Sequence, residues 1–246
     1  MALPKLEVPS YELELPISKK KIKFRPFLVK EQKILLMAME SGENGTIQNA
    51  VTDILKVCTL TENFNIYETP IIDIEYYFLN LRAKSVGEIA ESKYRCHNEV
   101  DDEQGGKKEC GNTIESKINL TEITPQTEVV VDPEIHITDK IVVKMKYPEF
   151  GIMTDSSKTQ DVAEMTFNMI AGCIEYIYDG EQFYYSHETP KEELIEFIEQ
   201  LNQEQFEKME QFFNNMPKLK KKVEMTCKKC GFNHSFDVEG LENFFG

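Results

Sequence analysis

The sequence predicts an α+β fold, in which helices and strands are grouped along the chain. An N-terminal β-hairpin is expected first, followed by one set of helices, a β-rich insert, a second set of helices and a short β element. A parallel α/β sheet would need repeated strand–helix–strand units, and the sequence lacks them. Two similar cysteine-containing segments also indicate a β-rich, zinc-ribbon-like element that joins the middle insert to the C-terminus.

The first part of the chain has the patterns of one hairpin and three helices. Apolar residues alternate on both sides of a polar turn in residues 11–28, which predicts a β-hairpin whose second strand ends near Pro26. Pro70 and Gly87 mark the start and the end of the third helix, as is usual for helix termini. The apolar periodicity predicts helices in residues 29–45, 46–60 and 70–88.

The middle of the chain is expected to be rich in strands. Residues 89–96 and 112–123 have the alternation of strands, and they flank a polar, glycine-containing insert. Residues 127–148 also alternate, so a β-meander or β-ribbon is predicted there.

Helical patterns return in the last third of the chain. Apolar residues recur every three or four positions from Val162 to Ile177, which predicts a helix within residues 159–180. Residues 181–188 are expected to form a short strand, and two helices are expected in residues 189–217.

Helix-start signals and changes in pattern divide the chain into four regions. Thr189 as N-cap, Pro190 at the first helical position and Glu192 at the third predict a capping box. The expected regions are 1–89, a hairpin plus helices; 90–150, a β-rich insert with the first cysteine knuckle; 151–217, helical; and 218–246, a second knuckle that packs on the insert.

The composition is that of an acidic globular protein. The 246 residues carry a net charge of −15, which disfavours binding to the phosphate backbone of nucleic acids. No apolar run reaches the roughly 18 residues of a membrane span, and the N-terminus lacks the pattern of a signal peptide. We therefore expect no nucleic-acid or membrane partner, and a reducing cytoplasm in which six cysteines favour metal ligation or burial over disulfides.

Four of the cysteines form two similar segments. Cys96 and Cys110 enclose a polar gap with paired lysines, and so do Cys227 and Cys230; a glycine follows the second cysteine of each pair. Glycine suits a tight knuckle because it readily takes a positive φ. Four thiolates in a tetrahedral array make a closed structural zinc site, so these cysteines are the predicted metal ligands.

The residues alone leave alternatives to a zinc site open. The thirteen-residue gap between Cys96 and Cys110 is not a standard spacing, so an empty or decayed site, or cysteines that simply pack, are the alternatives. His97 and His234 adjoin the knuckles and could each replace a thiolate, although surface positions are expected for both. A thioredoxin-like redox pair is disfavoured because Cys227 lies in a strand–turn–strand pattern.

The sequence gives no sign of a catalytic site. It contains no glycine-rich phosphate loop, no nucleophile elbow and no zinc-protease motif, and its four histidines are scattered. Cys58 and Cys173 fall on apolar helix faces, where core packing is expected. The basic run at residues 218–222 is expected to be an exposed lead-in to the last strand rather than a phosphate site.

Several segments resemble the T4-type phage baseplate family, which includes a baseplate hub subunit and a hub assembly protein. The segments are KFRPFLVKEQKILLMAMESG, DIEYYFLNLRAKSVGE, FFNNMP and the closing C-x-x-C-G…GLENFF. The resemblance covers nearly the whole chain. Relatives commonly carry paired C-x-x-C knuckles, and this chain departs from that pattern in its enlarged first knuckle.

The resemblance implies a non-enzymatic protein of a contractile-tailed phage, made late and assembled in the host cytoplasm into the virion tail. Its expected partners are other baseplate and tail hub proteins. Four functions stay open: a hub structural subunit, a transient assembly factor, a zinc-ribbon module that binds nucleic acid, and an enzyme with an unrecognised site. Interface anchors would come from aromatic and basic residues on amphipathic helices, and the candidates are Tyr76, Arg82, Phe212 and Phe244.

Overall fold

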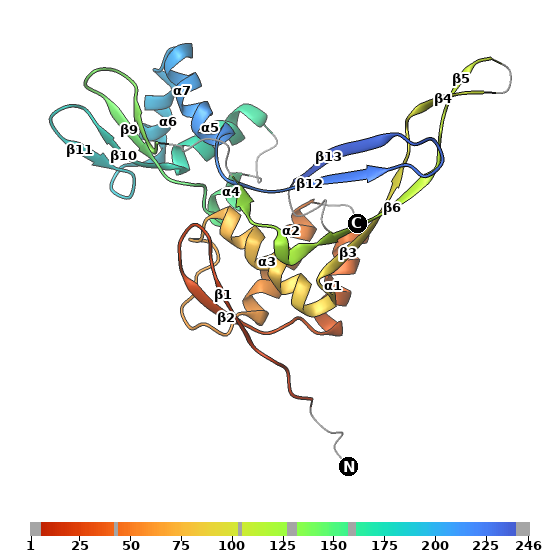
Figure 1. Ribbon diagram of the computed structural model, residues 1–246. Helices are drawn as coiled ribbons and strands as arrows, with labels where there is room; N and C mark the ends of the chain where they lie inside the picture. The colour runs from red at the N-terminus through yellow and green to blue at the C-terminus, as the bar shows by residue number, and fades with distance from the viewer. Residues whose placement is uncertain (1–5, 42–43, 103–104, 127–131, 157–160, 240–246) are drawn as a thin grey trace.

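The computed structural model describes residues 6–41, 44–102, 105–126, 132–156 and 161–239 (Figure 1). The protein combines helices with several small antiparallel sheets, which confirms the α+β class. The start of the ribbon expected at residues 127–148 lies outside the described residues, and so does Phe244. In Figure 1 a helical body carries a second module on one side and a long β-rich arm on the other.

The helical body is built from the predicted hairpin and three helices. The strands pair antiparallel with Tyr11 opposite Phe24 and Leu13 opposite Ile22, so the alternating apolar side chains lie on one face. Helix α2 buries Val51, Ile54, Leu55 and Cys58 along one face, whereas Ile47 on the same face is half-buried. The bounds are β1 Tyr11–Glu14, β2 Lys21–Phe24, α1 Val29–Ser41, α2 Asn44–Cys58 and α3 Ile71–Val86.

Helix α3 is buried on two sides. Tyr77 and Phe78 contribute to the core of the helical body, whereas Leu79 and Ala83 contribute to a separate core under the arm. The Asp73 carboxylate, fully buried, accepts hydrogen bonds of 2.8 Å from the backbone N–H groups of residues 17 and 18, at the turn of the hairpin. This helix therefore holds both the hairpin and the arm.

The arm consists of two antiparallel ribbons and a smaller hairpin. Its bounds are β3 Ile89–Arg95 with β6 Thr113–Asn119, β12 Lys218–Thr226 with β13 Asn233–Glu239, and β4 Glu99–Asp101 with β5 Lys107–Glu109. The polar insert of the sequence is thus a hairpin of its own. A 3₁₀ turn, Leu120–Glu122, leads from the first ribbon to β7, Pro125–Gln126, which pairs with the start of β12. Ile118, Leu219 and Val238 form part of the core between the ribbons.

The second module has one four-stranded antiparallel sheet covered by helices. The sheet order is β11-β10-β9-β8, so the strands expected in the 90–150 insert pair with a strand from beyond residue 150. Phe212, a candidate interface anchor, is 4% exposed and belongs to this core, so that assignment was wrong. The bounds are β8 Glu134–His136, β9 Val142–Met145, α4 Phe150–Ser156, α5 Val162–Gly172, β10 Ile174–Tyr178, β11 Phe183–Tyr185, α6 Lys191–Glu199 and α7 Gln203–Asn214.

The predicted helix within residues 159–180 is wrong in its second half. Helix α5 ends at Gly172 and the chain continues as strand β10. The pairing of β10 with β9 shifts between Ile174 and Tyr176, as at a β-bulge. The buried residues of β10 are Ile174 and Ile177, three positions apart, and this spacing imitates a helical repeat.

The predicted capping box at Thr189 is also wrong. Helix α6 begins after Pro190, which has no side-chain capping bond, and the Thr189 hydroxyl donates to the Tyr185 carbonyl instead. A capping box is present one helix later, where Asn202 and Gln205 exchange side-chain and backbone hydrogen bonds at the start of α7. Within the described ranges, no helix has the length and hydrophobicity that crossing a membrane would require.

A carboxylate with a raised pKa lies where α3 meets the arm. Glu75 is half-buried, and burial together with the nearby negative charge of Glu239 raises its pKa to about 7. Its unfolded pKa is near 4.5. The folded protein therefore binds the proton more tightly than the unfolded chain, so Glu75 stabilises the fold below about pH 4.5 and this contribution is lost as the pH rises towards 7.

We predict that Glu75→Gln flattens the fall of the free energy of unfolding between pH 4.5 and 7. It should also stabilise the protein at pH 8 by about 1–3 kcal/mol, because glutamine needs no deprotonation at this buried position. Urea unfolding across this pH range measures the effect. Glu12→Gln, in the exposed part of β1, is the control. Parallel pH profiles for wild type and Glu75→Gln would contradict the prediction.

Candidate metal centre

Two turns meet near the outer part of the arm, and each carries two of the predicted cysteines (Figure 1). The first turn connects β3 to β6, with Cys96 directly after β3. The second turn connects β12 to β13 and contains Cys227 and Cys230. The strand–turn–strand context expected for Cys227 is confirmed.

The long gap of the first turn is accommodated by the β4–β5 hairpin. Glu99 lies opposite Glu109 in this hairpin, which brings the two ends of the insert together. The Cys110 N–H then donates to the Asn98 carbonyl at 2.8 Å, and the Cys96 N–H donates to the Asn112 carbonyl at the same distance. The insert therefore projects as a hairpin, and Cys96 and Cys110 lie at the base of this hairpin.

The two turns have the same backbone geometry despite their different lengths. The Gly111 N–H donates to the Cys96 carbonyl at 2.9 Å, and the Gly231 N–H donates to the Cys227 carbonyl at 2.8 Å. Gly111 has a φ of 64° and Gly231 a φ of 74°, in the left-handed region that glycine favours. The prediction of two equivalent knuckles with positive-φ glycines is confirmed.

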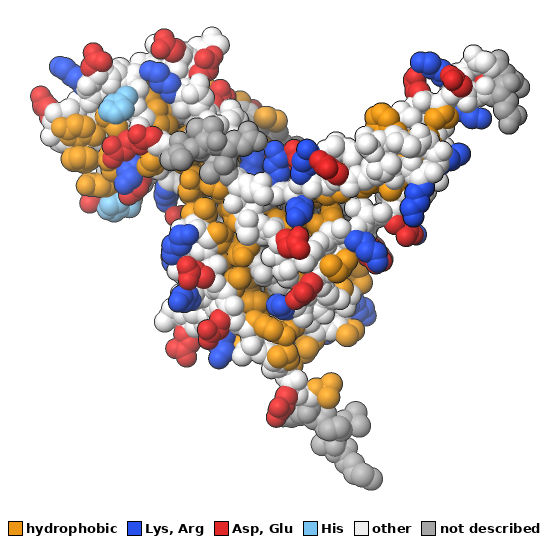
Figure 2. Space-filling model, viewed as in Figure 1, with side chains coloured by type: hydrophobic (Ala, Val, Ile, Leu, Met, Phe, Trp, Pro, Cys, Tyr) orange, Lys and Arg blue, Asp and Glu red, His pale blue; other side chains and the backbone are white. Residues whose placement is uncertain are grey.

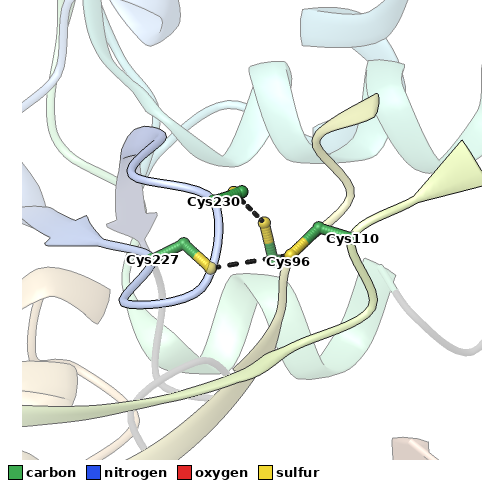
Figure 3. Close-up of side chains that lie close together, drawn as sticks. All are labelled: Cys96, Cys110, Cys227 and Cys230. Carbon is green, nitrogen blue, oxygen red and sulfur yellow. Dashed lines mark hydrogen bonds between the residues drawn. The ribbon is translucent and has the colours of Figure 1, made fainter. Parts of the chain in front are cut away.

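The four sulfurs converge at one point (Figure 3). The Sγ atoms of Cys96, Cys110, Cys227 and Cys230 all lie within 4.8 Å of one another. The distance between the sulfurs of Cys96 and Cys230 is 3.7 Å, and between those of Cys110 and Cys227 it is 3.8 Å. Three of the cysteines are buried and Cys230 is half-buried. The structure thus brings together every predicted ligand.

These sulfur distances fit a metal site better than a disulfide. A disulfide has a sulfur–sulfur distance of about 2.05 Å. A tetrahedral site with zinc–sulfur bonds of about 2.3 Å places its sulfurs about 3.8 Å apart. The chemistry of four soft sulfur donors also favours zinc over hard cations such as calcium or magnesium.

Polar groups around the cluster point donors at the sulfurs. The side-chain amides of Asn98 and Asn112 donate to Cys230 and Cys227 at 3.6 Å and 3.5 Å. Lys229 donates to the Cys110 carbonyl at 3.3 Å, which places a positive charge beside the cluster. Donors in these positions stabilise negative charge on metal-bound sulfur.

The thiols of the cluster differ in acidity. Hydrogen bonds from the backbone N–H groups of Cys230 and Lys229 lower the pKa of Cys227 to about 6. Burial raises the pKa of Cys96 to about 12. One thiolate is thus favoured by the protein alone, whereas four adjacent thiolates would require a bound cation to offset their mutual repulsion.

His234 lies beside the sulfurs, so the surface position expected for it was wrong. It is 8% exposed and its Nε2 lies 3.1 Å from the Cys96 sulfur. Its ring also packs against Tyr94 and Phe232. The alternation of β13, in which His234 shares a face with the buried Val238, is the signal that would have revealed it.

The predictions for the other histidine and for the two remaining cysteines are confirmed. His97 is exposed and its Nδ1 lies 3.3 Å from a carboxylate oxygen of Glu109. Cys58 and Cys173 are fully buried in two separate hydrophobic cores, as expected for packing residues.

The sequence model for the T4 bacteriophage base plate protein family matches residues 8–246. The chain belongs to this family. The match spans nearly the entire sequence, so it includes the residues of the helical body, the second module and the arm. Neither a curated protein nor a solved structure matches the chain.

We predict that Gly231→Ala destabilises the protein by about 1–2 kcal/mol, because alanine is conformationally strained at positive φ. Chemical denaturation measures the effect. Lys228→Ala, at an exposed position of the same turn, is the matched control and should change stability by less than about 0.5 kcal/mol. Equal stability of the two variants would show that the knuckle geometry is not required.

Proposed function

We propose that this protein is a non-enzymatic component of the baseplate hub of a contractile-tailed phage, in which it docks other tail proteins. Membership of the base plate family supports a structural role in the virion tail. We further propose that the arm is closed by a structural zinc ion held by Cys96, Cys110, Cys227 and Cys230. A transient hub assembly factor is the alternative, and the virion measurement below separates the two.

The observation that carries the proposal of a structural zinc ion is the convergence of four cysteine sulfurs from two distant turns. A zinc ion with four sulfur ligands has no coordination position left for water or substrate, so its role is structural. When bound, the ion would neutralise the thiolates and fix their tetrahedral arrangement. The protein's own residues supply the knuckle backbone, the amide donors and the buried His234 contact.

Closure matters because the outer part of the arm has little hydrophobic core of its own. The apolar residues packed with the cysteines are few: Tyr94, Val100, Ile114 and Met225. The cysteines of the two turns are more than one hundred positions apart in the chain, so a metal link would close a long loop. The binding free energy of the ion would therefore contribute directly to the stability of the arm.

The lysine run at residues 218–222, which could favour nucleic acid, lies in β12, and its side chains form ion pairs within the protein. Lys218 and Lys220 form ion pairs with carboxylates of β13, and Lys221 pairs with Glu122 at 3.3 Å. These carboxylates offset the local positive charge, and the whole chain carries a net charge of −15. Both observations disfavour a nucleic-acid-binding ribbon.

We predict that the purified protein contains about one equivalent of zinc and that Cys227→Ser loses most of it, because three thiolates bind zinc far more weakly than four. Elemental analysis measures the metal, and limited proteolysis should show earlier cleavage in the arm of the variant. Cys58→Ala, in the core of the helical body, is the control and should keep its zinc. A metal-free wild-type protein would contradict the four-thiolate site.

We also predict that purified phage particles contain this chain at a fixed low copy number, as expected for a structural hub subunit. Quantitative mass spectrometry of virions and of isolated baseplates measures it. Presence in assembly intermediates but absence from virions would favour the transient assembly factor. Absence from both would contradict a baseplate role.

A further inference from the structure

The two ribbons of the arm leave two strand edges facing the same groove. Strand β6 pairs with β3 along one edge, and within the described residues no strand pairs with its other edge. Strand β12 pairs with β13, and among the residues that the structure describes only Lys218 and Leu219 are paired on its other edge, with β7. Such edges present backbone N–H and C=O groups that can pair with an added strand.

The hydrogen-bond register shows which residues of β6 face outward. Leu120 donates to the Glu88 carbonyl and Cys96 donates to the Asn112 carbonyl, so the even-numbered residues of β6 bond to β3. The backbone groups of Thr113, Glu115 and Lys117 therefore point away from β3. By the same reasoning, the Cys227–Phe232 bond directs the even-numbered residues of β12, such as Glu224, away from β13.

A groove lies between these two edges. It consists of two adjoining hollows of about 410 and 930 Å³ that share Glu115, Lys117 and Met225 in their walls. The residues that line it come from both ribbons, including the outward-facing positions of β6. The groove is bounded by the 3₁₀ turn at one end and by the cysteine turn at the other, where Asn112 and Lys228 line it.

The charge of the groove differs from that of the whole protein. Five lysines and three glutamates line it, which gives a local charge of +2, whereas the chain as a whole carries −15. The lysines are Lys93, Lys117, Lys221, Lys222 and Lys228, and the glutamates are Glu115, Glu122 and Glu224. Basic and acidic side chains are interspersed along this arm in the space-filling view (Figure 2). Lys117, Lys221 and Lys222 already form ion pairs with Glu91, Glu122 and Glu224, so the charge that suits the groove to an acidic occupant comes chiefly from Lys93 and Lys228.

We propose that the groove is a docking site for an extended, acidic strand of a partner protein, which adds to the outer edge of β6. Backbone hydrogen bonds to residues 113, 115 and 117 would hold the strand, and the lysines of both ribbons would select acidic side chains. This inference rests on the proposed docking role in the baseplate. In this proposal the arm recognises the partner, and the cysteine cluster holds together the two ribbons that form the walls of the groove.

Two other roles are possible for the lysine-lined edges: prevention of strand pairing and self-association. The test separates both from docking of an acidic strand. Lysines on an edge can serve only to prevent strand pairing, in which case no acidic strand binds. A second copy of the chain could pair edge to edge, but two copies each carrying −15 would repel each other.

The test uses the full-length protein and a synthetic peptide of alternating glutamate and valine with blocked ends. Binding is followed by calorimetry, and hydrogen exchange locates protected backbone amides. We expect protection at Thr113, Glu115 and Lys117. The same peptide with N-methyl groups along one edge, which cannot pair as a strand, should not bind.

Matched substitutions identify the edge. Glu115→Pro removes an outward N–H without removing a bond to β3, so it should weaken peptide binding by about tenfold or more, whereas Glu115→Thr should keep binding within about twofold. Glu224→Pro makes the equivalent change on β12, and it should bind the peptide as Glu224→Thr does, because both variants lose the same side-chain charge and only the first loses an outward N–H of β12. The double variant Lys93→Glu/Lys228→Glu, which needs no change of backbone, should weaken binding about fivefold or more.

The outcomes decide the proposal. No protection in β6, equal binding by the proline and threonine variants, loss of binding only in Glu224→Pro, or equal binding of the N-methylated peptide would each overturn it. Sedimentation that shows dimers dissociated by Glu115→Pro would assign the edge to self-association and also overturn it. A protein that is present in virions but binds no peptide would keep its baseplate role and lose this docking site. A protein that binds the peptide but is absent from virions and from assembly intermediates would keep the docking site and lose the baseplate role.

Discussion

The two-sided burial of helix α3 is the constraint on which the rest of the structure depends. One side of the helix packs Tyr77 and Phe78 into the helical body, and the other side packs Leu79 and Ala83 under the arm. At its start, Ile71 donates a backbone hydrogen bond to the Pro148 carbonyl, which ties the helix to the segment between β9 and α4 of the second module. A helix that is apolar on both sides cannot face water on either, so body and arm must assemble around it.

The arm extends away from this support, and its two parts are held by different forces. Near α3, Ile118, Leu219 and Val238 form a conventional hydrophobic core between the ribbons. Farther out, each ribbon has only two strands among the described residues, and the core is reduced to a few side chains around the cysteines. Ribbons of two strands are marginally stable in water, so a cluster of four sulfurs takes the place that a larger core would fill. This is why the cluster is best understood as a structural device.

The same architecture accounts for the open groove. The two ribbons are joined at the base by the 3₁₀ turn and meet again at the cysteine turns. Among the described residues β6 and β12 do not pair with each other, so one edge of each lies along the groove. Lysines line these edges in a chain that is otherwise strongly acidic. A protein of the base plate family that contacts several neighbours would benefit from a recognition surface whose charge is opposite to that of its bulk.

The sequence by itself determined the features that depend on local patterns: the hairpin, most of the helices, the strands around the insert, and the two equivalent knuckles with their glycines. It also identified the four cysteines, because the paired lysines and the Cys–Gly context repeat although the spacing does not. Only the tertiary structure decided the remainder, since it depends on contacts between distant segments. The bulge in β10 gives the buried residues Ile174 and Ile177 a spacing that resembles a helix. His234, on β13, lies beside Cys96 of the other ribbon, which is 138 positions away in the sequence. The sulfurs converge because both ribbons pack against α3 and each other, and no local pattern carries that information.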